Sequence, residues 1–245
     1  MPRKPRFAPG GIAYHVMNRT CGGIQLFEDS NDYQAFERVL AEAMDREPTM
    51  RLCAYCLMPN HFHLVLWPRE GGRLSRFMQW LTMTHTQRWH AHRDTGGRGH
   101  LYQSRFKSFP IQQNGHFLNV CRYVERNALR ANLVVRAEEW RWGSLWSQQR
   151  TYALIHRRLA AWPVAMPIDW VRHVNDPQDE KELDALRLAR DRGRPYGDTD
   201  WTHEIARDLG IESSMRPTGR PARTTPMLAP KRKEGQKPFL LSLTS

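Results

Sequence analysis

The sequence predicts an α+β protein: a ferredoxin-like antiparallel sheet with helices on one face, one added helix, and a helical and partly disordered basic C-terminal extension. Three observations support this fold class. Short runs rich in β-branched and aromatic residues alternate with longer runs whose apolar residues recur at helical spacing. Their order is strand, helix, strand, strand, helix, strand, helix, which is the split βαβ arrangement with one helix added. The last segment is basic and contains several prolines, which favours a flexible tail.

The first half of this pattern consists of a strand, a helix and a hairpin. Residues 11–19 form an apolar strand. Asp29-Ser30 then caps a helix, whose buried face is formed by Tyr33, Phe36, Leu40 and Met44. A second strand covers residues 51–57. The Pro59-Asn60 turn sends the chain into the next strand, so we expect these two strands to pair as a hairpin.

The second half adds a helix, a strand and the extra helix. Arg73 begins an amphipathic helix, residues 101–111 form a fourth strand, and residues 116–132 form a third helix. In such a strand Arg105 and Lys107 share one face. Their charges fit two interpretations equally: a groove that follows DNA phosphates, or the protection of an edge strand.

The composition divides the chain into a principal domain, a helical extension and a basic flexible tail, over residues 1–150, 151–212 and 213–245. Within the extension, residues 179–192 predict a charged helix and residues 202–209 a short amphipathic one. The sequence Arg192-Gly193-Arg194-Pro195 resembles a minor-groove hook. Because it lies where the charged helix must stop, a turn is the better interpretation.

The charge balance favours nucleic acid as the partner. The chain carries a formal net charge of +12 and has a sequence pI of about 10.1, and such a surplus promotes association with polyanions. A basic membrane-surface protein is the alternative, although no run approaches the ~20 apolar residues of a spanning helix. No signal peptide is apparent after Met1, so we expect a cytoplasmic protein without a membrane partner. Cys53 and Cys56 have zinc-ribbon spacing but face opposite sides of a strand, so we expect buried small hydrophobes.

The strand after Pro59-Asn60 contains the first candidate functional residues. Side chains two apart in a strand point the same way, so His61 and His63 share one face at a spacing that suits a single metal ion. The alternative is two histidines that only pack in the sheet. A third ligand is needed to decide between them.

The added helix supplies that ligand. Tyr123 and Asn127 are four residues apart and therefore lie on one helical face. With His61 and His63, the Asn127 carbonyl oxygen would complete a mixed, partly open site for Mg²⁺ or Mn²⁺. The Tyr123 phenol would then lie beside the ion, although a helical tyrosine is more often a core or interface aromatic.

The combination of these motifs resembles a known family. The segment Ala54-Tyr55-Cys56-Leu57-Met58-Pro59-Asn60-His61-Phe62-His63, the strand Tyr14-His15-Val16-x-Asn18-Arg19 and Tyr123-x-x-x-Asn127 followed by Leu129-Arg130-Ala131 are similar to the single-tyrosine HUH transposases. Within that group the chain resembles the REP-associated tyrosine transposases. The resemblance is strong over about residues 7–150 and looser over the tail. One departure is Asn127-Ala128, where the family often has Asn-Pro, and it favours a helix that continues past Asn127.

The resemblance implies an enzyme that cleaves and rejoins single-stranded DNA near hairpin or palindromic repeats through a 5′-phosphotyrosine. It implies that Tyr123 is the nucleophile, that His61 and His63 bind the metal, and that Asn127 is the third ligand. Two alternatives remain open. One is a domesticated protein that binds DNA or RNA hairpins without turnover, and the other is a hydrolase in which Tyr123 orients a water molecule.

The partner implied by this resemblance is single-stranded or hairpin DNA, bound by a monomer or homodimer in the nucleoid of a bacterial cell. Arginine and lysine would hold its phosphates. The residues expected to do so are Arg3, Lys4, Arg6, Arg19, Arg105, Lys107, Arg130, Arg220 and Arg223.

Overall fold

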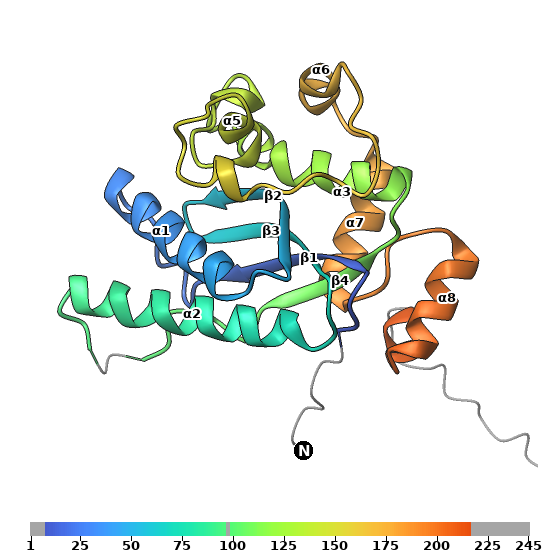
Figure 1. Cartoon of the computed structure of the whole chain (residues 1–245), viewed down its shortest axis with the longest axis horizontal. Coiled ribbons are helices and arrows are strands. Elements are labelled where there is room, and N and C mark those ends of the chain that lie inside the picture. Colours follow the sequence, from blue (N-terminus) through green and yellow to red (C-terminus); the bar gives the residue numbers. More distant parts are fainter. Residues whose placement is uncertain (1–7, 97–98, 217–245) are drawn as a thin grey trace, which may run out of the picture. The chain divides into compact units, whose positions relative to one another are not determined.

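A four-stranded antiparallel sheet forms the centre of the protein (Figure 1). The computed structural model describes residues 8–96 and 99–216, and residues 8–215 belong to one compact unit. The strands lie in the order β2-β3-β1-β4, with bounds Met50–Met58, His61–Pro68, Ala13–Arg19 and Lys107–Ile111. This order, with the predicted β2–β3 hairpin, confirms the α+β ferredoxin-like prediction.

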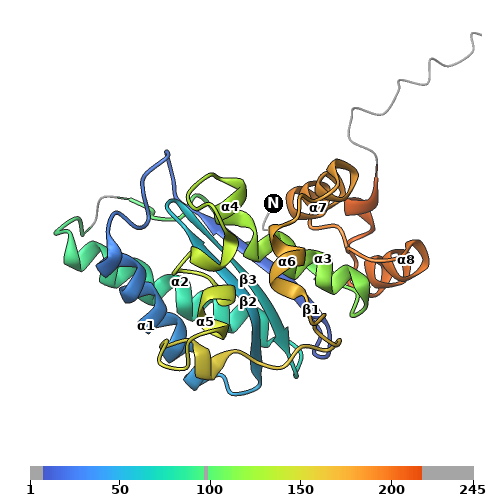
Figure 2. The ribbon, with the colours of Figure 1, turned by 90° about the horizontal axis from the view of Figure 1, so that it is seen from above.

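Two helices cover one face of the sheet. These are α1 (Ser30–Arg46) and α2 (Arg73–His92), and Figure 2 shows both on the same side. The Asp29 side chain caps α1 by accepting from the backbone N–H groups of residues 31 and 32, as its position predicts. Fully buried side chains from both layers fill the space between them, among them Val16, Phe36, Phe62, Leu64 and Leu81.

The opposite face carries the added helix and parts of the extension. Here α3 (Gly115–Glu125) and α7 (Glu180–Arg192) pack on the sheet, and α6 (Trp170–Asn175) packs on α3 (Figure 2). Asn114 caps α3 by accepting a hydrogen bond from the His116 backbone at 2.9 Å. This second core contains Val65, Phe109, Phe117, Val120 and Leu186. Because α3 packs directly on β2 and β3, its inward side chains face the histidine strand.

The remaining helices are short. They are α4 (Asn127–Arg130), α5 (Ser144–Gln148), α8 (Thr199–Asp208) and three 3₁₀ turns at Ala137–Glu139, His156–Arg158 and Glu212–Met215. The predicted charged helix is confirmed as α7. Gly193 ends this helix in a left-handed conformation (φ 68°), so the segment Arg192-Gly193-Arg194-Pro195 begins with the predicted turn. The short amphipathic helix begins three residues before its predicted start. No helix among residues 8–96 and 99–216 has the length and apolar content to cross a bilayer.

Three local predictions were wrong. The fourth strand was predicted from residue 101 but begins at Lys107. The Gln103 N–H still donates to the Arg19 carbonyl at 2.9 Å, but residues 104–106 then leave the β1 ladder. Arg105 therefore lies in a loop and shares no strand face with Lys107. The continuous helix over 116–132 divides at Arg126 into α3 and α4. The Asn127 side chain donates to the Tyr123 carbonyl at 3.1 Å, in competition with the helical backbone bond.

The third error concerns the cysteines. A β-bulge between Leu52 and Ala54 changes the alternation of β2, so Cys53 and Cys56 contribute to the same core layer. Both thiols are free and buried, and burial raises the pKa of each to about 12. Their expected role as small hydrophobic residues is confirmed.

Candidate active site

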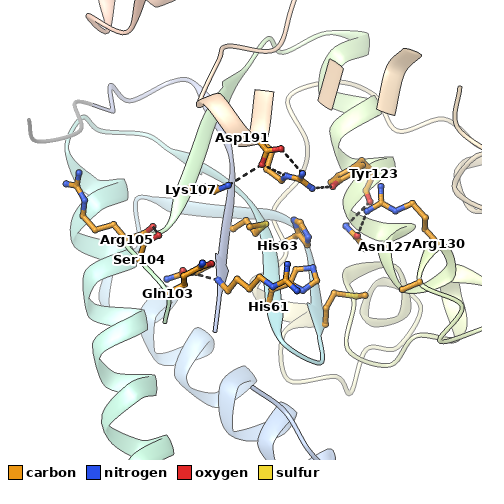
Figure 3. A pocket seen from close by; sticks show the side chains of 16 residues that line it. His61, His63, Gln103, Ser104, Arg105, Lys107, Tyr123, Asn127, Arg130 and Asp191 are labelled. Atoms are coloured by element: carbon orange, nitrogen blue, oxygen red, sulfur yellow. Dashed lines mark hydrogen bonds and ion pairs between the residues drawn. The ribbon is translucent and has the colours of Figure 1, made fainter. Parts of the chain in front are cut away.

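A pocket of about 370 Å³ lies where β1 and β3 meet α3, α4, the segment before β4 and the end of α7. Each predicted site residue in the described part of the chain lines it (Figure 3): Arg19, His61, His63, Arg105, Lys107, Tyr123, Asn127 and Arg130. The other predicted DNA-binding residues lie outside the described residues: Arg3, Lys4, Arg6, Arg220 and Arg223. The fold thus gathers side chains that are far apart in the sequence.

His61 and His63 lie on the same face of β3, with ring centroids 4.9 Å apart. The Nδ1 atom of each ring is already engaged. His61 Nδ1 lies 2.7 Å from the Asn60 side-chain oxygen, and His63 Nδ1 lies 2.8 Å from Nε2 of His15. When each Nδ1 carries the proton, both rings present an Nε2 lone pair to another partner.

His15 supports this arrangement from β1. It is fully buried behind His63, between the ring of Phe109 at 4.8 Å and that of Tyr123 at 6.1 Å. Burial lowers the pKa of His15 to about 3 and, together with nearby arginines, that of His61 to about 4. Burial and the neighbouring imidazoles hold the pKa of His63 well below its usual value. All three rings are therefore neutral near pH 7, which is the form that binds metal ions.

Tyr123 points from α3 toward these histidines. Its ring meets that of His63 edge-on at a centroid distance of 5.8 Å and is only 3% exposed. The guanidinium of Arg130 lies over the ring at 4.5 Å. At the hydroxyl, Nη1 of Arg190 donates a hydrogen bond at 3.3 Å. Two arginines from different helices thus contact the phenol, one at its face and one at its reactive oxygen.

Asn127 lies one helical turn after Tyr123, as predicted. Its side chain is buried and held at both ends, donating to the Tyr123 carbonyl and accepting from Nη2 of Arg130 at 2.7 Å. An amide oxygen has two lone pairs, so this bond leaves one for a further partner.

The donor set fits a divalent ion. The two imidazoles of His61 and His63 and the Asn127 oxygen all line the pocket. Within residues 8–96 and 99–216 no group of three His, Cys, Asp or Glu side chains could hold a metal. With an amide oxygen as third donor, an ion held here would have mixed nitrogen and oxygen ligands.

The pocket is strongly cationic. Arg19, Arg105, Lys107, Arg130 and Arg190 line it, whereas Asp191 is its only carboxylate among the described residues. In Figure 3 Arg105 extends away from the other labelled side chains. Such a surface attracts a phosphodiester backbone.

Sequence reasoning missed two contributors. The sequence offers His15 as part of the Tyr14–Arg19 motif and as an alternative third metal ligand, but not as the support of His63. Strand alternation places it on the same face as Met17 and hence as His63, once the β1–β3 register is known. Arg190 carries no comparable signal, because in sequence it is one charge among many on the α7 surface.

Comparison with known proteins finds a family that matches the segment containing most of this site. The family model described as Transposase IS200 like matches residues 10–127, which contain His61, His63, Tyr123 and Asn127. No curated protein matches the chain. Residues 10–127 are thus similar to the IS200-like transposase family, and the resemblance predicted from the motifs is confirmed.

Two solved structures are similar in fold. A REP-associated tyrosine transposase bound to a REP hairpin is 15% identical with a TM-score of 0.50, and the match covers 67% of this chain and 94% of that one. A candidate transposase from Deinococcus radiodurans R1 is 18% identical with a TM-score of 0.34, covering 51% of this chain and 96% of that one. The likeness to the first of these structures is one of fold.

Proposed function

We propose that the protein is a metal-dependent single-stranded DNA endonuclease and strand transferase that cleaves near hairpin or palindromic repeats. One observation carries this proposal. The Tyr123 ring lies 5.8 Å from that of His63, in a cationic pocket that His61 also lines and within the segment that matches the transposase family. A phenol, a metal-binding pair and a phosphate-attracting surface are the parts that such a reaction requires.

Mg²⁺ or Mn²⁺ is the proposed cofactor, held by Nε2 of His61, Nε2 of His63 and the Asn127 oxygen. The support is the chemistry of this donor set and the engagement of both Nδ1 atoms elsewhere. When bound, the ion would act as a Lewis acid that polarises a phosphoryl oxygen.

The proposed covalent step belongs to Tyr123. Its oxygen attacks the phosphorus of a phosphodiester, the P–O3′ bond breaks, and a 5′-phosphotyrosine forms. The phenolic proton leaves to water and the departing 3′ oxygen takes up a proton, so charge and atoms balance. Attack by a 3′-hydroxyl on the phosphotyrosine reverses the step and rejoins DNA without an external energy source.

Hairpin DNA is the proposed substrate class. The similar solved transposase is described as bound to a REP hairpin, and five cations surround the pocket here. Arg19 and Arg105 form no ion pair within the described residues, so their charges are available to phosphates.

The test uses a 3′-end-labelled DNA hairpin with single-stranded flanks, taken from the repeats beside this reading frame. It is incubated with Mg²⁺ or Mn²⁺ and separated on a denaturing gel. We expect the label to migrate with wild-type protein and with Tyr152→Phe, a control at an exposed tyrosine outside the pocket, but not with Tyr123→Phe.

Other outcomes would replace the proposal. Metal-dependent cleavage without an adduct in both wild type and Tyr123→Phe would identify a hydrolase. Tight binding with neither cleavage nor adduct, on several such hairpins, would identify a domesticated binding protein.

A further inference from the structure

We propose that Arg190 is a catalytic residue of this reaction and that the C-terminal extension supplies it. Arg190 lies on α7, outside the segment matched by the family. Its Nη1 atom is 3.3 Å from the Tyr123 oxygen, the atom that would attack phosphorus. This inference rests on the proposed function, because it assigns a role at the same nucleophile.

The position of Arg190 is fixed by the docking of α7. Leu183, Leu186 and Ala189 are buried in the core shared with α3 and β4. After the Gly193 turn, the Tyr196 backbone N–H donates to the Pro110 carbonyl on β4 at 2.9 Å. The end of α7 is therefore attached to the sheet on both sides of Arg190.

The side chain is also oriented by a carboxylate. Asp191 accepts from Nε and Nη2 of Arg190 at 3.1 and 3.0 Å, which leaves Nη1 directed at Tyr123. Asp191 accepts from Lys107 at 3.2 Å as well, and Figure 3 shows these contacts running from Lys107 through Asp191 toward Tyr123. Two cations share one carboxylate, so one net positive charge remains beside the nucleophile.

The chemistry of arginine defines the role. A guanidinium stays protonated in proteins and cannot act as the base. It can stabilise negative charge on the tyrosine oxygen as the proton leaves to water, and on phosphoryl oxygens as the P–O3′ bond breaks. Preorganised donors at such positions are among the largest contributors to catalysis. In the reverse step the same contact stabilises Tyr123 as the leaving group.

Arg130 is the natural comparison within the pocket. It contacts the ring face of Tyr123 and the Asn127 oxygen. In the described part of the chain only Arg190 donates to the Tyr123 hydroxyl. The two arginines therefore divide the work: Arg130 holds the α3–α4 junction, and Arg190 acts at the reacting oxygen.

The test compares Arg190→Gln with Arg187→Gln. Arg187 is on the same helix, is partly exposed, and pairs with Glu180 and Asp184 outside the pocket. Adduct formation is measured in single turnover on saturating hairpin DNA, with DNA affinity and metal titration measured separately. We expect Arg190→Gln to slow adduct formation about 100-fold with little change in metal titration, and Arg187→Gln to match wild type.

Chemical rescue separates a catalytic role from a structural one. Guanidinium ion added to Arg190→Ala should restore part of the lost rate, which it would not do for a folding defect. A wild-type rate in Arg190→Gln, or no rescue of a slowed Arg190→Ala, overturns the inference alone. Failure of the wild type to form any adduct overturns the proposed function and this inference together.

Discussion

The two faces of the sheet each bury a neutral histidine site, and the comparison separates a functional site from a structural one. On the α1–α2 face, His85 is 3% exposed and its Nδ1 lies 2.8 Å from the Tyr102 hydroxyl. On the α3 face, His63 is equally buried and its Nδ1 lies 2.8 Å from His15. Burial lowers the pKa of both His63 and His85 below the usual value. Burial, charge state and hydrogen bonding therefore do not distinguish them.

The residues around each histidine distinguish the two sites. His85 is packed against the aromatic rings of Phe27 and Phe36 in the hydrophobic core. His63 lines a pocket with a second imidazole, a tyrosine and several cations. A histidine site becomes chemically useful when a ring nitrogen meets a cavity that also holds reactive and charged groups. The following predictions test whether the His63 site affects metal binding and cleavage while the His85 site affects only stability.

The largest effect is expected at the cavity side. His61→Ala removes one of the two proposed imidazole ligands and should abolish metal-dependent cleavage while leaving hairpin binding largely unchanged, because phosphate contacts dominate affinity. Cleavage and DNA binding are measured in matched metal beside His92→Ala, an exposed histidine at the end of α2. Equal cleavage by His61→Ala and wild type would refute the metal assignment.

A smaller effect is expected from His15, which contacts His63 from behind. His15→Phe keeps a ring of similar size but leaves Nδ1 of His63 without its partner. Such outer contacts orient ligating histidines, so metal affinity should fall about 10- to 100-fold. Isothermal titration of Mn²⁺ into the Tyr123→Phe background measures this without turnover. A titration that His15→Phe leaves unmoved would show that His15 only fills space.

The structural site should respond to pH instead. The pKa of His85 is lowered to about 3 in the folded protein, whereas an unfolded histidine titrates near 6.5. The folded state therefore binds fewer protons between these values, and the stability contributed by His85 is complete above pH 6.5 and is lost as pH falls. At pH 5 the loss is about 2 kcal/mol, from ~1.4 kcal/mol per pH unit.

Comparison with His85→Phe isolates this contribution. The other buried histidines titrate in both proteins and cancel in the difference. Urea unfolding at pH 7 and pH 5 should show that wild type loses about 2 kcal/mol more than the variant over this interval. Equal losses of unfolding free energy in the two proteins would mean that His85 becomes protonated without unfolding. The metal titration of His85→Phe should remain that of wild type.

Local sequence patterns predicted the side-chain positions that a strand or helix determines by its own geometry. Alternation placed His61 and His63 on one face, and the four-residue spacing placed Tyr123 beside Asn127. The order of elements predicted the sheet. Each of these inferences uses a repeat that the backbone imposes over a few residues.

The errors arose where the chain departs from that repeat. The β2 bulge brought Cys53 and Cys56 into one layer, and the Asn127 side chain interrupted the predicted third helix. Arg190 lies 67 residues from Tyr123 in sequence. Its role depends on how α7 docks, which the charged sequence of that helix does not specify.

The smallest predicted effect concerns Lys107, which shares Asp191 with Arg190 at the pocket edge. Both partners of this ion pair are about half exposed, so Lys107→Gln should change the free energy of unfolding by less than about 1 kcal/mol. If Lys107 also contacts a phosphate, the slope of log affinity against log salt should decrease by about one. Lys181→Gln makes the same charge change on the exposed side of α7 and should leave the slope unaltered. An unaltered slope in Lys107→Gln would mean that Asp191 alone occupies this cation, and that the excess positive charge beside Tyr123 comes from Arg190.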